Sequence, residues 1–343
     1  MEKCNQLEEK IWLAQNSDFW GFTMELFEFQ CANNPIYQKF ITHRSKTNLD
    51  YATLPYLPVQ FFKDHIVTTA HASPTTYFET SGTTANRNLI SATTEHLSSI
   101  PIQPGRHYIH DLSIYDQSIA LGFIQQYGPV EDYIFIGLLP TYIERPHASL
   151  IYMVKTLMKL SYQAEEYFFL YDYKALDDQL LALQATNKKI MLWGVSFALL
   201  DWSAATTIKQ FNNLIIMETG GMKGRRKEIV KEELHSLLYA QLPGVSIHSE
   251  YGMTELLSQA FALDGIHFTC PNWMKVIARD IYDPYSLAPE GQSGIIRIID
   301  FANIYSCPFI ETADIGKVYE DGRFVIQGRI DHSDIRGCNL LVS

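Results

Sequence analysis

The sequence has few cysteines, and their arrangement excludes two classes of protein. The five residues, Cys4, Cys31, Cys270, Cys307 and Cys338, are odd in number, and no two of them are spaced as Cys-x-x-Cys. A disulfide framework and a cysteine-based zinc site are therefore not expected, which favours a reducing cytoplasm. The histidines, among them His65, His71 and His107, lack metal-ligand spacing, so we interpret them as structural or exposed.

Positive charge and long apolar runs are also scarce. The net charge of −11 disfavours nucleic acid as a partner. No apolar stretch reaches the roughly 18 residues that a membrane-spanning helix requires, and the polar first residues lack a signal-peptide core. We therefore expect a cytoplasmic protein without a transmembrane segment. With 343 residues, 47% of them hydrophobic, the chain can bury a large core.

Strands and helices are expected to alternate through the middle of the chain. Such alternation is typical of an α/β fold with a parallel sheet, in which ligands bind where the strands end. The predicted strands are Asp132–Leu139, Lys189–Val195, Asn213–Met217 and Gly244–Glu250, and the predicted helices are His147–Ser161 and Glu228–Ala240.

The two ends of the chain give further predictions. Residues 17–30 read as a helix with Ser17 as its N-cap, because Phe22, Leu26 and Phe29 share one face. The aromatic, proline-containing segment 56–63 is expected to be extended. The last hundred residues are more β-rich. Gly294–Asp300 alternates weakly, and Asp321-Gly322 lies between two apolar segments as a hairpin turn would.

Two short hydroxyl-bearing segments suggest how a nucleotide could be bound. The first, Thr80-Ser81-Gly82-Thr83-Thr84, suits a loop whose hydroxyls and backbone N–H groups wrap a triphosphate. The second, Tyr251-Gly252-Met253-Thr254-Glu255, offers a ring for a purine, a hydroxyl for a phosphate and a carboxylate for Mg²⁺. Taken alone, the first also fits a Ser/Thr turn, and the second fits a strand end followed by a helix cap. Together they indicate an enzyme that activates a carboxylic acid with ATP.

Three further candidates follow the same logic. Gly220-Gly221 comes after a predicted strand, where a flat ring could lie against the backbone. The basic residues just beyond it could attract anions or could form a solvated helix face. Asp314 could accept hydrogen bonds from both ribose hydroxyls or could be a turn residue. Arg329 could contact a phosphate or the ribose, or could form a surface salt bridge.

The order of these motifs resembles that of the adenylate-forming superfamily of acyl-CoA synthetases, luciferases and peptide-synthetase adenylation domains. A narrower resemblance, over nearly the whole chain, is to the LuxE-like acyl-protein synthetases of bacterial luminescence operons. The segments that carry this narrower resemblance are Asn33–Tyr37, Leu57–Lys63, Trp193–Phe197, Glu218–Arg225 and Arg336–Leu340.

The resemblance implies a fold, a reaction and a set of site residues. The fold would be α/β, a large N-terminal lobe with mixed sheets flanked by helices and a β-rich C-terminal part. A fatty acid and ATP would give an acyl-adenylate, and the acyl group would pass to Cys338 and then to a partner protein such as an acyl reductase. By resemblance, phosphates would be bound by Thr80–Thr84 and contacted by Thr254, adenine flanked by Gly220-Gly221 and Tyr251, Mg²⁺ ligated by Glu255, and the ribose and neighbouring groups held by Asp314 and Arg329.

The tail cysteine has some independent chemical support. A thioester forms from a thiolate, and the nearby Arg336 could lower the pKa of the Cys338 thiol. Gly337 and the short remaining tail would let the thiol swing into the site. The alternative is an inert small residue in a tail.

The chain departs from the superfamily pattern in two places. Ala85-Asn86-Arg87-Asn88 follows the phosphate loop where the superfamily has Gly-x-Pro-Lys, so the loop lysine is missing and Arg87 is a possible replacement. The superfamily also has a mobile C-terminal lobe with a catalytic lysine after the position of Asp331. We expect residues 1–330 to form the large lobe and 331–343 a short tail, with that lobe absent or the sequence truncated. Lys223 and Arg225 are the nearest substitutes for its lysine.

Three functions remain open at this point. The leading hypothesis is an acid–thiol ligase that acylates a protein. A ligase that uses coenzyme A, as phenylacetate-CoA ligases do, is the second. The third is a non-catalytic subunit that binds a nucleotide or an acyl group.

Overall fold

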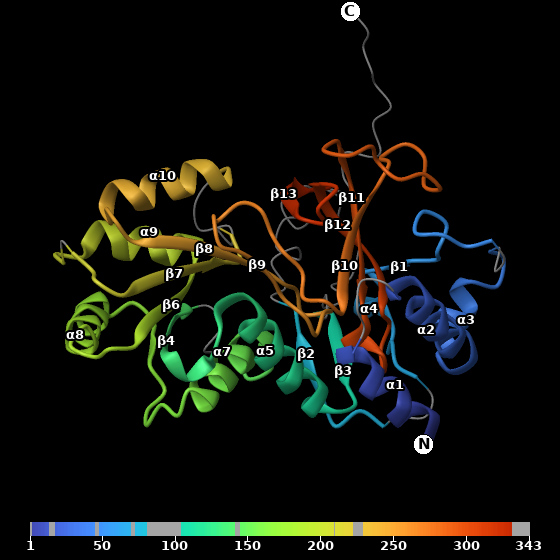
Figure 1. Cartoon of the computed structure of the whole chain (residues 1–343), viewed down its shortest axis with the longest axis horizontal. Coiled ribbons are helices and arrows are strands. Elements are labelled where there is room, and N and C mark those ends of the chain that lie inside the picture. The colour runs from blue at the N-terminus through green and yellow to red at the C-terminus, as the bar shows by residue number, and fades with distance from the viewer. Residues whose placement is uncertain are drawn as a thin grey trace, which may run out of the picture.

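The computed structural model describes residues 2–13, 18–44, 48–69, 73–80, 104–140, 145–208, 210–221 and 229–330. Over these residues the chain forms two larger sheets flanked by helices, plus a short two-stranded ladder (Figure 1). The α-helices described are α1 Glu2–Leu13, α2 Phe19–Asn33, α3 Pro35–Phe40, α4 Phe61–Asp64, α5 Leu112–Tyr127, α7 Ser149–Leu160, α8 Tyr173–Leu183, α9 Ser196–Ala205 and α10 Lys231–Gln241. The strands are β1 Leu57–Pro58, β2 Thr76–Glu79, β3 Arg106–Ile109, β4 Tyr133–Leu138, β5 Phe168–Phe169, β6 Lys189–Val195, β7 Leu214–Thr219, β8 Ser246–Tyr251, β9 Ala260–Ala262, β10 Met274–Arg279, β11 Ser293–Asp300, β12 Phe309–Val318 and β13 Phe324–Arg329.

The six-stranded sheet has the order β5-β4-β6-β7-β8-β9, and its strands run parallel up to β8. Only β9 is antiparallel to its neighbour. Helices α9 and α10 cover one face of this sheet, and α5 and α7 cover the other (Figure 1). Because both faces are covered, β4 is buried along its whole length and β6 at all but its first residue. Such strands read as continuous apolar runs.

The predicted alternation of strands and helices is confirmed in this sheet. Strand β6 occupies the predicted range Lys189–Val195, and β4, β7 and β8 overlap their predicted ranges. Helices α7 and α10 likewise overlap the two predicted helices. The parallel pairing of β4, β6, β7 and β8 is also as expected.

The second sheet has the order β1-β12-β11-β10. Strand β13 also pairs with β12, along the part of β12 that follows its short pairing with β1. It contains the predicted hairpin, since β12 and β13 are antiparallel and Gly322 has a φ of +81°, the left-handed backbone that favours glycine. Strand β11 alternates weakly in sequence because it is buried at every residue except Ser293. Helices α1 to α4 pack beside this sheet (Figure 1). There Phe301 stacks on Phe19 at a centroid distance of 4.3 Å.

Two predictions near the N-terminus need correction. Helix α2 begins at Phe19 after an N-cap at Asp18, so the helix does not begin at Ser17, which lies outside the described residues. Segment 56–63 is extended only at Leu57–Pro58, which pairs in parallel with β12. Helix α4 then begins at Phe61. A proline restricts the residue before it rather than those that follow, so a helix can form soon after Pro58.

The fold places the ends of two parallel strands side by side. Strand β7 ends at Thr219 and β8 ends at Tyr251, and Glu218 lies opposite Ser249 in their register. Gly220-Gly221 and the segment that begins at Tyr251 therefore leave the sheet at one edge, as expected for ligand-binding segments in α/β folds.

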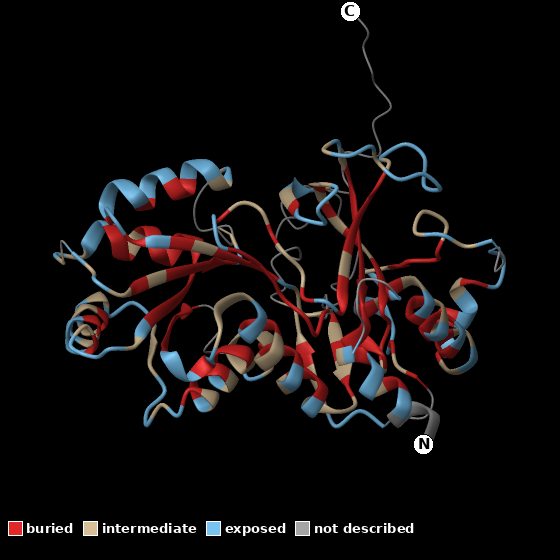
Figure 2. Cartoon of the chain, in the orientation of Figure 1, coloured by how far each residue is buried: buried red, intermediate tan, exposed pale blue. Residues whose placement is uncertain are grey.

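The buried residues concentrate along the strands of both sheets (Figure 2). None of the described helices is both long and apolar enough to span a bilayer.

Candidate functional site

Three residues predicted from separate motifs meet in one cluster. Tyr251, the last residue of β8, donates a 2.7 Å hydrogen bond from its phenol to Oδ2 of Asp314 on β12. Nε of Arg329, at the end of β13, lies 2.7 Å from Oδ1 of the same carboxylate. Asp314 is buried, whereas the Arg329 side chain is 66% exposed and can reach solvent or a ligand. The register of β12 with β13 places Asp314 opposite Arg329, so sheet pairing builds this part of the site.

Burial and charge set the protonation states in this cluster. Burial and the Asp314 carboxylate raise the pKa of the Tyr251 phenol well above its ordinary value, so Tyr251 is a neutral donor. The Asp314 carboxylate also raises the pKa of Arg329, which keeps the guanidinium charged. The result is one buried carboxylate with a neutral donor on one oxygen and a cationic donor on the other.

Glu255 is a second carboxylate close to this cluster. Burial raises its pKa to about 7, an effect that the Arg329 charge partly opposes and the Asp314 charge adds to. A carboxylate in this state is under-compensated by its neighbours, so an added cation would stabilise its ionised form. That property fits the predicted role of Glu255 as a ligand of Mg²⁺.

The donor set can be tested against the needs of Mg²⁺. In the part of the chain that the structure describes, no group of three or more His, Cys, Asp or Glu side chains could form a metal centre. Mg²⁺ commonly binds through one or two carboxylates together with substrate phosphates and water, rather than in an all-protein cage. A single partly buried Glu255 therefore fits a magnesium ion that arrives with a nucleotide.

Thr254 lies beside the start of the predicted phosphate loop. Its hydroxyl donates a long, 3.5 Å hydrogen bond to the carbonyl of Glu79, the last residue of β2. The next residue, Thr80, is fixed by Gly105, whose N–H donates to the Thr80 hydroxyl at 3.0 Å. The structure thus brings the beginning of the first motif to the end of the second. The remaining loop residues, Ser81, Gly82, Thr83 and Thr84, lie outside the described residues, as do Arg87, Lys223, Arg225 and Cys338.

Gly220-Gly221 adopts a backbone that other residues avoid. Their φ angles are +77° and +68°, both in the left-handed region. For an ordinary L-residue this region costs about 1–2 kcal/mol per position, so two glycines suit this turn. The chain therefore leaves β7 in a backbone conformation that requires glycine, at the position where the sequence predicts a contact with adenine.

A buried network that no sequence motif signals supports this turn. Glu218 accepts hydrogen bonds from Ser196 at 2.6 Å, from Ser249 at 3.1 Å and from the ammonium of Lys231 at 2.9 Å. Burial acts to raise the pKa of Glu218, but the Lys231 charge and the Ser196 hydroxyl outweigh it, so the pKa lies below its usual value. On the next residue, the hydroxyl of Thr219 donates to Glu250 at 2.5 Å. These pairs join residues up to 31 positions apart, which no local motif signals.

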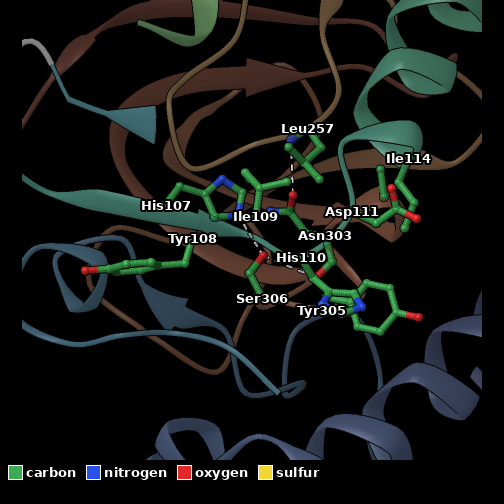
Figure 3. Close-up of a pocket in the computed structure, with 11 residues that line it drawn as sticks. His107, Tyr108, Ile109, His110, Asp111, Ile114, Leu257, Asn303, Tyr305 and Ser306 are labelled. Atoms are coloured by element: carbon green, nitrogen blue, oxygen red, sulfur yellow. Dashed lines mark hydrogen bonds between the residues drawn. The ribbon is translucent and has the colours of Figure 1, made fainter. Parts of the chain in front are cut away.

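A small pocket lies close to the second motif (Figure 3). It is lined by His107, Asn303, Tyr305 and Ser306, among others, together with Leu257. Its volume of about 10 Å³ has room for about one water molecule. It is therefore far too small for a nucleotide, and its importance lies in the polar side chains around it.

Solved structures share this fold. The ATP-bound RpMatB–BxBclM chimera B3 matches with a TM-score of 0.54 and 17% identity, covering 74% of this chain and 47% of that one. ATP-bound MatB from Rhodopseudomonas palustris matches with a TM-score of 0.53, 16% identity and the same coverage. A double mutant of o-succinylbenzoate CoA synthetase (MenE) from Bacillus subtilis, bound to a product analogue, matches with a TM-score of 0.50 and 13% identity over 75% of this chain and 49% of that one.

These matches define the fold and its extent. No protein-family model matches the sequence, and no curated protein matches it either. The mixed α/β architecture, with its sheets flanked by helices, is the fold of these solved structures, and the predicted α/β fold class is thereby confirmed. The chain spans about half the length of the solved structures that it matches.

Proposed function

We propose that this protein activates a carboxylic acid with ATP and transfers the acyl group to a thiol. The observation that carries the proposal is the meeting of Tyr251, Asp314 and Arg329, with Glu255 close by, at the end of β8. These residues come from three separate motifs of the sequence, each of which predicts nucleotide binding. The similarity of the fold to ATP-bound MatB supports the same direction.

The proposed reaction has two balanced steps. In the first, a carboxylate oxygen of the acid attacks the α-phosphorus of ATP, forming an acyl-adenylate and releasing pyrophosphate. In the second, a thiolate attacks the acyl carbon, forming a thioester and releasing AMP. Both steps develop negative charge that fixed cations and hydrogen-bond donors must stabilise.

The chain's own residues supply these groups. Arg329, exposed and held by Asp314, is placed to contact the ribose or a phosphate of the bound nucleotide. Thr254, whose hydroxyl makes a long hydrogen bond to Glu79, would offer that hydroxyl to a phosphate oxygen. The Gly220-Gly221 turn, left-handed at both residues and directly after β7, would lie against the adenine ring. Mg²⁺, held by the Glu255 carboxylate, would offset the charge of the triphosphate.

We propose further that the acid is a fatty acid and that the thiol is Cys338, from which a partner protein receives the acyl group. This subtype is supported by the LuxE-like segments of the sequence. One of them, Leu57–Lys63, is built into the fold through the pairing of β1 with β12.

A coenzyme A ligase is the second candidate. It is favoured by the match to MenE, which is described as a CoA synthetase. In that case the thiol of step two would be a small molecule, and Cys338 would not be acylated.

Intact mass spectrometry separates the two candidates. The pure protein is incubated with ATP, Mg²⁺ and a mixture of fatty acids, with and without coenzyme A, and weighed before and after hydroxylamine treatment. A hydroxylamine-labile gain of one acyl group that maps to Cys338 supports the protein ligase. Acyl-CoA in solution without protein acylation supports the second candidate. Neither product, together with no release of pyrophosphate, would contradict the proposal.

A further inference from the structure

The turn that carries Thr254 and Glu255 has no regular secondary structure of its own. Residues 252–259 connect β8 to β9 outside any helix or strand. Backbone hydrogen bonds of a sheet therefore do not fix this segment, although its two polar side chains would need defined positions to contact a nucleotide. Side chains from elsewhere in the chain hold it instead.

His107 holds the turn from β3. Its Nδ1 lies 2.9 Å from the carbonyl oxygen of Thr254, and its Nε2 lies 2.8 Å from Oγ of Ser306. A carbonyl oxygen can only accept, so Nδ1 carries the proton and Nε2 accepts from Ser306. Burial lowers the pKa of His107 to about 4, so the ring stays neutral near pH 7 and keeps this tautomer.

Asn303 holds the next two peptides. Its Nδ2 donates to the carbonyl oxygen of Glu255 at 2.8 Å, and its Oδ1 accepts from the N–H of Leu257 at 3.1 Å. The side chain is fully buried and lies in the short 3₁₀ helix Phe301–Asn303 between β11 and β12. The single amide of Asn303 thus satisfies an acceptor and a donor of the backbone on either side of Leu256.

Asp300, the last residue of β11, completes the set. Its Oδ2 accepts from the N–H groups of Leu257 and Ser258 at 3.1 and 3.0 Å. Its Oδ1 accepts from the Ser258 hydroxyl at 2.6 Å. The same oxygen also caps the 3₁₀ helix through the N–H of Ala302. Asp300 therefore ties the position of Asn303 to that of the turn.

We propose that His107, Asn303 and Asp300 are positioning residues that hold Thr254 and Glu255 in the geometry needed to bind MgATP. The inference rests on the proposed function. Figure 3 shows His107, Asn303 and Ser306 around the small pocket, with Leu257 facing them. Together the three side chains bond the carbonyls of Thr254 and Glu255 and the N–H groups of Leu257 and Ser258.

The physical reason for holding the peptides on both sides of Glu255 lies in the partial burial of this residue. A partly buried carboxylate gains hydration by moving towards solvent. Hydrogen bonds on both neighbouring peptides oppose that movement before the cation arrives. Residues that orient a metal ligand in this way commonly change metal affinity by about 10–100-fold when they are replaced.

Asn303→Leu is the first test, because leucine keeps much of the volume and removes both hydrogen bonds to the turn, those with Glu255 and Leu257. The matched control is Asn213→Leu, since Asn213 donates to the carbonyl of Lys188 at 2.7 Å just before β7, away from its ligand-binding end. Hydrogen exchange at Leu257 and Ser258 and calorimetric binding of MgATP are measured on wild type and both variants. We expect faster exchange and about tenfold weaker MgATP binding for Asn303→Leu alone.

A second pair of variants keeps the inference testable if Asn303→Leu does not fold. His107→Asn keeps an amide donor near the position of Nδ1, and His107→Leu removes it. We expect MgATP affinity to be reduced in His107→Leu and largely restored in His107→Asn. If wild type binds MgATP and every folded variant of Asn303 and His107 binds it equally well, the proposed positioning role is wrong and the proposed function stands. If wild type itself binds no MgATP, the proposed function fails, and the inference fails with it.

Discussion

The phenol of Tyr251 donates a 2.7 Å hydrogen bond to Asp314, joining the end of β8 to β12 across 63 positions of sequence. The two residues belong to different sheets, so this hydrogen bond connects the two sheets at the candidate site. The same carboxylate is held by Arg329 from β13. One buried carboxylate thus orders a ring and a guanidinium that come from different parts of the fold.

Replacing Tyr251 with Phe tests this connection. The variant keeps the ring but leaves Oδ2 of the buried Asp314 without its donor, which should cost about 1–3 kcal/mol of unfolding free energy. We also expect weaker ATP binding, because Asp314 and Arg329 lose a fixed neighbour. Denaturant unfolding and calorimetry measure the two effects. Tyr37→Phe, which removes a buried phenol bonded to the carbonyl of Pro55, is the control. It should lower stability without weakening ATP binding, and equal ATP affinities in the two variants would contradict the assignment.

The pH dependence of stability tests the environment of Glu255. Its pKa of about 7 in the folded protein lies above the usual value of 4.5, so folding favours the protonated carboxyl. Its contribution to stability is therefore full below about pH 4.5 and is lost as the pH rises through about 7. Glu255→Gln should be more stable than wild type at pH 8, with the difference shrinking towards pH 5.

The comparison between wild type and variant is essential in this experiment. Burial also raises the pKa of Asp300, to about 6, and adds a contribution of the same sign that both proteins share. The exposed Glu28→Gln serves as a control and should change stability little at any pH. A constant difference between Glu255→Gln and wild type from pH 5 to pH 8 would show that Glu255 is not held in such an environment.

The glycine turn after β7 gives a third prediction. Gly220→Ala places a side chain at a φ of +77°, which should cost about 1–2 kcal/mol and displace the backbone next to the predicted adenine position. Gly128→Ala imposes a similar strain at a φ of +82°, after α5, with open space around the added methyl group. We expect both variants to lose stability, but only Gly220→Ala to bind ATP more weakly. Equal ATP affinities of Gly220→Ala and Gly128→Ala would show that Gly220 does not contribute to ATP binding.

The tail cysteine gives a fourth prediction. Cys338→Ser should still release pyrophosphate when ATP and a fatty acid are supplied, because a hydroxyl at this position does not affect the first step. It should carry no hydroxylamine-labile acyl group, since it lacks the thiol. The measurement is pyrophosphate release beside intact mass, with Cys31→Ser as the matched variant. Normal acylation of Cys338→Ser would exclude Cys338 as the acceptor.

Local signals explain how much of the fold could be predicted. Lys189–Val195 is a bounded apolar run, and Asp321-Gly322 has the turn chemistry of a hairpin, so both were predicted correctly. Helix α4 was missed because four residues after a proline are too short to show a helical period. The start of α2 differs by one position because Ser17 and Asp18 are both residue types favoured at an N-cap, so composition does not choose between them.

The candidate site divides in the same way. Tyr251, Glu255, Asp314 and Arg329 lie in short motifs, and the structure brings them together. His107 and Asn303 could not be found from sequence, because they bond the turn from 147 and 48 positions away and lie in no motif of their own. Their roles depend on the pairing of elements, which only the folded chain reveals.

Isotope exchange between pyrophosphate and ATP tests the central claim most directly, because it requires a reversible first step and no acceptor thiol. The pure protein is incubated with ATP, Mg²⁺, labelled pyrophosphate and single fatty acids of increasing chain length. The proposed function predicts labelled ATP that appears only when an acid is present and is strongly reduced in Glu255→Gln. ATP binding without exchange for any carboxylic acid would contradict it and would favour a subunit that binds the nucleotide without turning it over.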